Sequence, residues 1–316
     1  MTASSYKPTS TTVPRSDRVL QLNSTVVSGF AGAKSSTFPM QVLGLDVDCL
    51  YTTQHSNHSG YDHVSKADFA NATLKNLFEG LSKNDLLQNR YDYFFTGFVS
   101  DEEFLQYMIE MYKKLKAENP NILWFCDTVI GDKNKHTGED IYYCPKELVP
   151  LYRDCVLQYA NVITPNQLEL ELLAQTSIRT RQEALDAMRH LHEAHSGLSV
   201  IILTSVDTEF GSEMLVSSSN HDANQALTIH YHQASFEEQP FHFTGTGDCM
   251  MGLLIGNLHN NDLQVACANA LSSMQAILQN SVKAIQDGCN PFGELKIVQS
   301  MAEITNPPRT HQVVPL

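Results

Sequence analysis

YDYFFTGF at residues 91–98 is a buried-strand sequence that ends just past a glycine. An amphipathic segment follows at 104–117, and ILWFCD at 122–127 is a second buried strand that leads into an acid. A strand, a helix and a strand in this order predict two parallel neighbours in one sheet, because the helix returns the chain to the end where the first strand began.

The same alternation continues along the chain. Apolar runs predict strands at 19–22, 47–51, 161–164 and 200–204, and helix patterns lie at 67–80, from 167, at 180–195 and at 247–284. A polar loop is expected at 131–140, and the turn-rich stretch 208–243 favours antiparallel strands. The expected fold is α/β, with a central, mainly parallel sheet covered by helices on both faces. In such sheets, ligands bind beyond the carboxyl ends of the strands.

Composition changes only near the start of the chain. Residues 1–16 are rich in Ser and Thr and contain no acid, so residues 1–17 are predicted to be a disordered extension, with an organelle transit peptide as the alternative. No linker or repeat interrupts residues 18–316, so a single domain is expected there.

The formal net charge of the 316 residues is −14, from 21 basic and 35 acidic side chains. A surface of this sign repels nucleic acid and anionic membranes, and neither is expected as a partner. The seven cysteines contain no Cys-x-x-Cys pair, which favours reduced thiols and a cytoplasmic protein. The Asn-x-Ser/Thr triplets at Asn23, Asn57 and Asn71 are then expected to occur by chance.

Gly245-Thr246-Gly247-Asp248 precedes an apolar, helix-like run. Glycines let the backbone approach a ligand closely, and the start of a helix presents unpaired N–H groups and a positive dipole end. A phosphate fits such a site, and an acid beside it has a use as the base that accepts a proton from an attacking hydroxyl. An ordinary turn with a helix N-cap has a similar sequence, so these residues alone leave both interpretations open.

Oxygen-bearing side chains follow three of the other predicted strands. Asp127 and Asp132 flank a glycine loop and suit a hard cation, or they are solvated acids of a turn. Asn166 and Glu169 open a helix, where they suit either a capping box or a carboxylate that orders Mg²⁺ beside an amide that donates to phosphate. Thr204-Ser205 offers hydroxyls to phosphate or to a monovalent cation, or is an ordinary strand end.

Three histidines, His55, His58 and His63, lie close together in a polar segment. A zinc site is one interpretation, but no cysteine accompanies them and their spacing fits no usual site. A polar loop that contacts a substrate is favoured.

Together these segments resemble the vitamin B6 kinases, the pyridoxal kinase family of the ribokinase-like superfamily. The resemblance runs from about Arg18 to the C-terminus, and two of its motifs, TFPMQVLG at 37–44 and SNHSGY at 56–61, are specific to this family. The superfamily as a whole shares the Gly-Thr-Gly-Asp and Asn-x-x-Glu motifs. Further matching segments are VVSGFAG at 26–32, Asp92-Tyr93, Thr96-Gly97, 127–132, 163–169 and Thr204-Ser205.

The resemblance implies a ribokinase-like three-layer fold and transfer of the ATP γ-phosphate to the 5′-hydroxymethyl group of pyridoxal, pyridoxamine or pyridoxine. It implies that Asp248 is the general base and that the backbone of Gly245, Thr246 and Gly247 forms an anion hole. The substrate-binding residues that it implies are Ser24, Thr53, His55, Ser59, Phe98 and Asp248. The ATP-binding residues that it implies are Asp127, Tyr143, Asn166, Thr204, Ser205, Thr246 and Gly247.

The same resemblance implies metal ions and a partner subunit. Asp132 and Glu169 would serve Mg²⁺ or another divalent cation. Asp127, Thr164 and Thr204 would serve K⁺ or Na⁺. Members of the family are usually homodimers, so a homodimer is expected.

A few positions depart from the family pattern. Thr128 replaces the usual proline of the acidic motif, which implies a less rigid loop. Phe98 stands where tyrosine is usual, so a hydroxyl near the substrate is missing, and Ser59 replaces the usual threonine but keeps its hydroxyl. In the loop that would cover ATP and substrate, Tyr142 competes with Tyr143 for the same alignment.

Other functions remain open on the sequence alone. One is a non-catalytic B6-binding regulatory protein on the kinase scaffold, and another is a related kinase that acts on hydroxymethylpyrimidine or a sugar. A dinucleotide-binding oxidoreductase is disfavoured, because no Gly-x-Gly-x-x-Gly follows the first strand.

Overall fold

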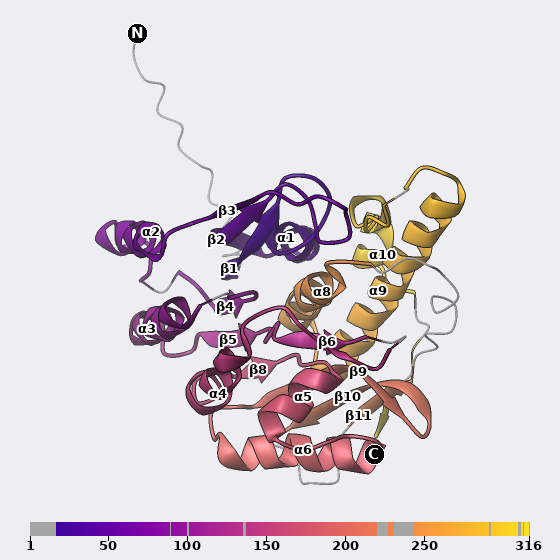
Figure 1. Ribbon diagram of the computed structural model, residues 1–316. Helices are drawn as coiled ribbons and strands as arrows, with labels where there is room; N and C mark the ends of the chain where they lie inside the picture. Colours follow the sequence, from indigo (N-terminus) through magenta and orange to yellow (C-terminus); the bar gives the residue numbers. More distant parts are fainter. Residues whose placement is uncertain are drawn as a thin grey trace, which may run out of the picture.

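Strands and helices alternate along the chain (Figure 1). The computed structural model describes residues 17–88, 90–99, 101–134, 137–219, 227–230, 243–290, 292–308, 311 and 313–315. The strands are β1 (Arg18–Val26), β2 (Asp46–His55), β3 (Lys66–Asp68), β4 (Tyr93–Thr96), β5 (Leu123–Cys126), β6 (Gly131–Lys133), β7 (Asp140–Tyr142), β8 (Val162–Ile163), β9 (Val200–Thr208), β10 (Gly211–Ser218), β11 (Leu227–His230) and β12 (Val313–Pro315). The helices are α1 (Ala33–Val42), α2 (Asn71–Lys83), α3 (Glu102–Glu118), α4 (Val149–Leu151), α5 (Gln167–Ala174), α6 (Arg181–Ala194), α8 (Thr246–Asn260), α9 (Leu263–Gln286) and α10 (Met301–Thr305).

Within the described ranges, the central sheet has ten strands in the order β12-β11-β10-β9-β8-β5-β4-β1-β2-β3. The six strands from β9 to β2 in this order are parallel to their neighbours. At the two edges, β3 and β10–β12 pair in the antiparallel sense. The predicted mainly parallel sheet is confirmed, and so are antiparallel strands after residue 208, although residues 220–226 and 231–242 lie outside the described ranges.

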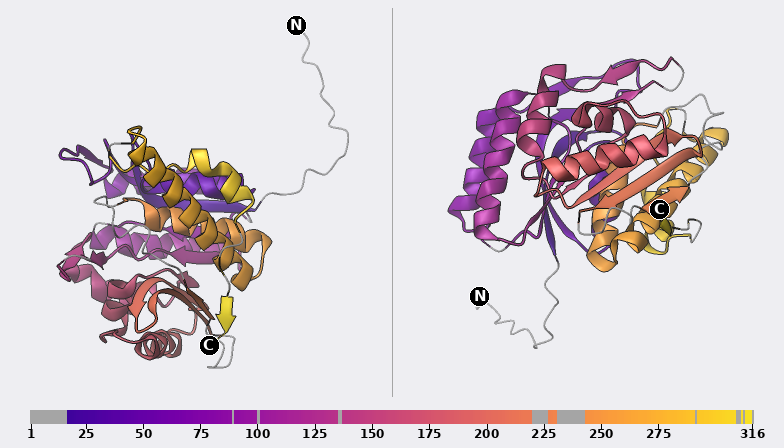
Figure 2. Two further views of the ribbon diagram at one scale, coloured as in Figure 1. Left: turned by 90° about the vertical axis from the view of Figure 1, so that its right-hand side faces the viewer. Right: turned by 90° about the horizontal axis from the view of Figure 1, so that it is seen from below.

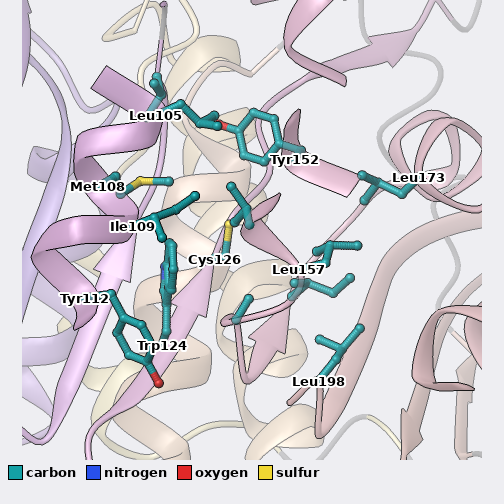
Figure 3. Close-up of a cluster of buried hydrophobic side chains, with 14 of the residues drawn as sticks. Leu105, Met108, Ile109, Tyr112, Trp124, Cys126, Tyr152, Leu157, Leu173 and Leu198 are labelled. Carbon is teal, nitrogen blue, oxygen red and sulfur yellow. The ribbon is translucent and has the colours of Figure 1, made fainter. Parts of the chain in front are cut away.

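Successive side chains of the central strands enter two separate apolar cores, because side chains alternate between the faces of a sheet. Phe94 and Trp124 lie in a core with the helices from α2 to α6, whereas Phe95 and Phe125 lie in a core with α1, α8, α9 and α10. Figure 2 shows the helices on either side of the sheet, and Figure 3 shows Tyr112 of α3 beside Trp124 in the first core. The sheet is therefore the middle of three layers, as expected.

Two segments differ from the expectation. Residues 131–133 and 140–142 pair as the antiparallel strands β6 and β7 where a loop was expected, with Asp132 opposite Ile141. The helix expected at 67–80 begins only at Asn71, because residues 66–68 pair with β2 as strand β3. Both segments are rich in polar side chains and lack the apolar alternation that identifies a strand. Each becomes a strand because its backbone pairs with another strand, β2 or β7, and the local sequence does not show this pairing.

The parallel strands place their carboxyl ends at one edge of the sheet. Ser24, Asp127 and Thr164 lie at or near the ends of β1, β5 and β8, as the sequence predicts. The strand expected at 200–204 instead continues to Thr208 as β9, because its second half pairs with β10, so Thr204 lies in the middle of the strand. Of the predicted extension, Asp17 pairs with His259 at 2.9 Å and residues 1–16 lie outside the described ranges, so the disordered extension stays a prediction. No helix in the described part of the chain is long and apolar enough to cross a bilayer.

Phe94→Ala tests the first core. Phe94 is fully buried, and its ring centroid lies 5.4 Å from that of Trp124. The substitution is expected to lower the free energy of unfolding by about 3–5 kcal/mol, because it removes buried surface and leaves a cavity. Urea unfolding followed by circular dichroism measures the loss. Leu77→Ala, at a position on α2 that is 52% exposed, is the control and should change stability by no more than about 0.5 kcal/mol. Equal effects of the two substitutions would contradict the assignment of Phe94 to the core.

Candidate active site

Gly245 turns the chain into α8. Its φ of +82° lies in the left-handed region, and a Cβ at this position would lie 2.5 Å from the carbonyl oxygen of Phe30. Only glycine meets both constraints without strain. The backbone N–H groups of the first turn of α8, Thr246–Asp248, lack partners within the helix, and Gly247 is exposed. This helix end therefore suits an anion.

Asp248 lies in that first turn, and two donors from the N-terminal part of the chain hold its carboxylate. Nδ2 of Asn23 donates to Oδ1 at 2.8 Å, and the N–H of Gly32 donates to Oδ2 at 2.8 Å. Burial raises the pKa of Asp248, and the two hydrogen bonds oppose this rise because they favour the ionised form. The carboxylate is thus fixed in orientation, and each oxygen keeps a lone pair for a further donor.

Asn23 was not predicted as a site residue. It is fully buried on β1, and its Oδ1 accepts from the N–H of Ser24 at 2.8 Å and from that of Phe98 at 3.2 Å. These two bonds fix the amide so that Nδ2 points at Asp248. A Cβ on Gly97 would lie 2.5 Å from the Asn23 amide, so this glycine makes room for it. In the sequence, Asn23 stands out only as part of an Asn-x-Ser/Thr triplet, a pattern that is associated with glycosylation and not with catalysis.

Asp127 follows β5 and faces the same turn. Its Oδ2 lies 3.8 Å from where a Cβ on Gly247 would stand, and the residue is 8% exposed. Burial raises its pKa well above the usual range, and the charges of Glu169 and Asp248 raise it further, whereas a hydrogen bond with Thr164 opposes the shift. Asp127 therefore lies close enough to Glu169, on α5, and Asp248, on α8, for their charges to repel its own, and these three side chains are called the acidic group below.

Glu169 closes the loop that follows Asp127. Its Oε1 accepts from the N–H groups of Ile130 at 2.7 Å and Gly131 at 3.3 Å, and its Oε2 accepts from the hydroxyl of Thr128 at 2.9 Å and from the N–H of Asn166 at 3.1 Å. Since the Asn166 side chain accepts from the Glu169 N–H at 3.0 Å, the predicted capping box is present. Burial raises the pKa of Glu169 to about 7 despite these donors. The Thr128 bond is one that the proline usual in the family cannot make.

Asp132 lies on the hairpin that begins at Gly131. Nδ2 of Asn166 donates to the carbonyl oxygen of Gly131 at 2.7 Å and so fixes the start of β6. The Asp132 side chain is partly exposed and accepts from the N–H of Lys133 at 2.8 Å. The hairpin therefore presents Asp132 next to the loop that Glu169 holds.

Tyr143 follows β7 and is 45% exposed. Burial of its hydroxyl, followed by the charges of Asp132 and Glu169, raises its pKa to about 12. Tyr142 instead packs against the first core, with the Lys146 ammonium 4.2 Å from its ring centroid. Tyr143 is therefore the ring that lies near the acidic side chains, whereas Tyr142 belongs to the core.

Hydrogen bonds join the segment that follows β8 to the middle of β9. The N–H of Thr204 donates to the carbonyl oxygen of Pro165 at 2.9 Å, and the Thr204 hydroxyl contacts the same oxygen at 3.3 Å. Thr164 is 6% exposed and bonds Asp127, whereas Ser205 is partly exposed. Thr164 therefore lies beside the acidic group, and Thr204 joins β9 to Pro165, which follows β8.

Of the residues predicted to bind the alcohol substrate, Ser24 lies near Asp248, and Thr53 and Ser59 lie on or after β2. Ser24 lies beside the Asp248 contact, since a Cβ on Gly32 would stand 2.7 Å from its Oγ. Ser59 is exposed in the loop after β2. The Thr53 hydroxyl donates to the Ala67 carbonyl oxygen at 3.2 Å and to Asp68 at 3.1 Å, so its hydrogen is engaged with β3.

His55 and Phe98 complete that set. Burial and the nearby charge of Lys66 lower the pKa of His55. Phe98 packs against the first core and reaches Asp248 only through its backbone N–H, which fixes Asn23. No group of three or more His, Cys, Asp or Glu side chains in the described ranges is arranged to hold a metal ion. The repulsion that Glu169 and Asp248 exert on Asp127 nevertheless suits a cation, and Mg²⁺ takes few protein ligands.

Comparison with known proteins confirms the family. Residues 130–285 match the model of the pfkB family carbohydrate kinases. The chain is 36% identical over 309 residues to pyridoxal kinase from Bos taurus, with 92% of this chain and 96% of that protein covered. It is also 36% identical over 296 residues to pyridoxal kinase from Arabidopsis thaliana, with 92% of each covered.

The fold agrees with these relatives. Pyridoxal kinase from Leishmania donovani in complex with ADP superimposes with a TM-score of 0.82 at 26% identity, over 95% of this chain and 99% of that chain. The same kinase has structures with ADP and pyridoxamine, and with ADP and pyridoxine. This chain therefore belongs to the pyridoxal kinase family, whose members are phosphotransferases related to the pfkB carbohydrate kinases.

Proposed function

We propose that this chain transfers the γ-phosphoryl group of ATP to the 5′-hydroxymethyl group of pyridoxal, pyridoxamine and pyridoxine. The observation that carries the proposal is the Asp248 carboxylate, held by two donors beside the free N–H groups that begin α8. The complexes of the Leishmania donovani kinase with ADP and B6 vitamers support the choice of substrates.

Asp248 acts as the general base. It takes the proton of the 5′-hydroxyl as that oxygen bonds to the γ-phosphorus, while the bond from the γ-phosphorus to the bridging oxygen breaks and ADP leaves with the electron pair. The backbone N–H groups of Gly245, Thr246 and Gly247 stabilise the charge on the transferred phosphoryl oxygens. Burial makes Asp248 a stronger base than an exposed aspartate, because it raises the pKa of the carboxyl group.

The remaining residues bind and orient the reactants. Ser24 and Ser59 donate to or accept from the substituents of the pyridine ring, with Thr53, His55 and Phe98 lining the approach. Asn166, Ser205 and Thr246 contact the ATP phosphates, and Tyr143 covers the site. Such a cover excludes water, which would otherwise accept the phosphoryl group.

Acidic and hydroxyl side chains near the site would hold the metal ions. Asp132 and Glu169 would hold Mg²⁺, and Asp127, Thr164 and Thr204 would hold K⁺ or Na⁺. Mg²⁺ neutralises phosphate charge when it is bound. Because the Glu169 carboxylate already accepts four hydrogen bonds, we expect it to act on the ion through water rather than by direct ligation.

Formation of pyridoxal 5′-phosphate from pyridoxal, MgATP and K⁺, followed by absorbance, tests the proposal. Product formation supports it. Binding of pyridoxal without product indicates a regulatory protein, and faster turnover of hydroxymethylpyrimidine or a sugar indicates a related kinase. We also propose a cytoplasmic homodimer, which fractionation and light scattering test. A monomer by light scattering would remove the dimer without affecting the assigned reaction.

Asp248→Asn removes the base but keeps the size of the side chain. We expect kcat to fall by about 10²–10⁴-fold, the usual contribution of a general base, with ATP and pyridoxal affinities nearly unchanged. Steady-state kinetics and direct binding measure both quantities. A kcat close to that of the wild type would remove Asp248 from its role.

Asn23→Ala removes a donor that favours ionised Asp248. The pKa of Asp248 should rise further, and since the base must be ionised, the acidic limb of the profile of log kcat/KM against pH should move to higher pH. Asn280→Ala, which removes a hydrogen bond from a side-chain amide on α9 to the Ser300 hydroxyl, is the control and should leave the limb in place. An unmoved limb in Asn23→Ala would show that the amide does not tune the base.

Asp132→Ala should raise the Mg²⁺ concentration needed for half-maximal rate, and excess Mg²⁺ should restore part of the activity. Titration of Mg²⁺ at fixed ATP measures the shift. Asp140→Ala, at an exposed position on the paired strand β7, is the matched control. Identical Mg²⁺ dependence in wild type and Asp132→Ala would take Asp132 out of the metal site.

A further inference from the structure

The carboxylate of Glu294, in the segment after α9, lies where three parts of the chain meet. Its Oε1 accepts from the hydroxyl of Tyr61 at 2.8 Å and lies 3.2 Å from Nε2 of His58. Its Oε2 accepts from the N–H of Phe30 at 3.1 Å. Neither the sequence motifs nor the proposed mechanism assigns a role to Glu294.

The groups that face Glu294 are donors. The N–H of Gly60 donates to Nδ1 of His58 at 3.1 Å, so in the neutral ring the proton stands on Nε2, toward Glu294, although that contact is not aligned as a straight hydrogen bond. Burial raises the pKa of Glu294, but the contacts with His58 and Tyr61 outweigh burial and hold it below its usual value. An ionised carboxylate, which only accepts, is the group that fits this surrounding.

Hydrogen bonds and helix packing connect Glu294 to the helix that carries Asp248. The Asn290 side chain accepts from the N–H of Glu294 at 2.9 Å and donates to its carbonyl oxygen at 2.8 Å and to that of Ser281, on α9, at 3.3 Å. Helix α9 packs on α8 within the second core (Figure 2). Glu294 is therefore fixed relative to the first turn of α8.

The loops that Glu294 contacts lie beside the Gly245 turn. Phe30 N–H binds Glu294, and two residues later Gly32 N–H binds Asp248. A Cβ on Gly60 would stand 3.7 Å from Oγ1 of Thr244, so the SNHSGY segment reaches the start of that turn. The ring of Tyr61 also stacks on Phe292, with centroids 4.5 Å apart.

We propose that Glu294 is a positioning residue that holds the substrate loop, residues 56–61, and the loop 29–32 in place relative to Asp248, and so sets the affinity for the alcohol substrate. The inference rests on the proposed function for its substrate, but the contacts that it invokes do not depend on turnover. Ser59, expected to contact the substrate, lies within the loop between His58 and Tyr61.

Glu294→Gln tests the proposal, because it places an amide donor against groups that are themselves donors. We expect KM for pyridoxal to rise by about tenfold or more, the size of a lost hydrogen bond to a charged group, while KM for ATP stays within about twofold. Tyr61→Phe keeps the stacking on Phe292 and loses one bond, so it should raise KM for pyridoxal by a smaller factor. Asp287→Asn, which removes an exposed ion pair with Lys283 at the end of α9, is the matched control.

Hydrogen exchange of peptides that span residues 56–61 provides a second readout. Faster exchange in Glu294→Gln than in the wild type and Asp287→Asn supports the positioning role. An unchanged KM for pyridoxal together with unchanged exchange overturns it, and a merely structural role would lower the melting temperature without changing KM. If the wild type forms no pyridoxal 5′-phosphate, the proposed function fails, and exchange alone still decides whether Glu294 holds the loop. If Glu294→Gln does not fold, Tyr61→Phe decides by the same two measurements.

Discussion

The structure of the site depends on one carboxylate that joins two segments far apart in the sequence. Asp248 binds Asn23 and Gly32, which precede it by 225 and 216 residues. Neither contact exists until β1 is in the sheet and α8 is packed against it, so the local motif becomes a site only through the whole fold. The left-handed turn at Gly245, against the carbonyl oxygen of Phe30, lets the two segments approach closely enough.

A second constraint is the negative charge gathered at the strand ends. Burial and repulsion by neighbouring carboxylates raise the pKa of Asp127, and burial raises that of Glu169. Ionising these carboxyl groups is therefore unfavourable when no cation lies beside them. Glu169 is held in place by four donors, among them the Thr128 hydroxyl. The proline usual in the family would restrict the backbone here, whereas Thr128 adds a hydrogen bond across to α5, so the loop that follows β5 is tied down by a different means.

The fold was predictable to the level of layers, because the alternation of buried strands and amphipathic helices is a local property of the sequence. The parallel order of β4 and β5 follows from the segment 91–127 in this way. The pairing of residues 131–133 with 140–142 was missed, because the charged residues and the glycine in these two segments show no apolar alternation. Family motifs predicted that Asp248 and Glu169 are site residues. The capping box predicted as the alternative for Glu169 is present in the structure, and it is compatible with a role in metal binding as well.

Asn23 and Glu294 show where prediction from sequence stops. Asn23 matters because the N–H of Phe98, 75 residues away, turns its amide toward Asp248. Glu294 matters because Tyr61, 233 residues away, donates to it. No local pattern contains either relation, because each depends on a partner that only tertiary packing brings near.

The position of Trp124 gives the protein an optical property. It is the only tryptophan in the chain, it is fully buried, and its indole N–H donates to the Thr96 hydroxyl at 2.8 Å. All indole emission therefore originates from one point on β5, three residues before Asp127. Excitation of this single chromophore observes the carboxyl ends of β4 and β5 without any introduced label, so the strand ends that hold the acidic group have their own spectroscopic reporter.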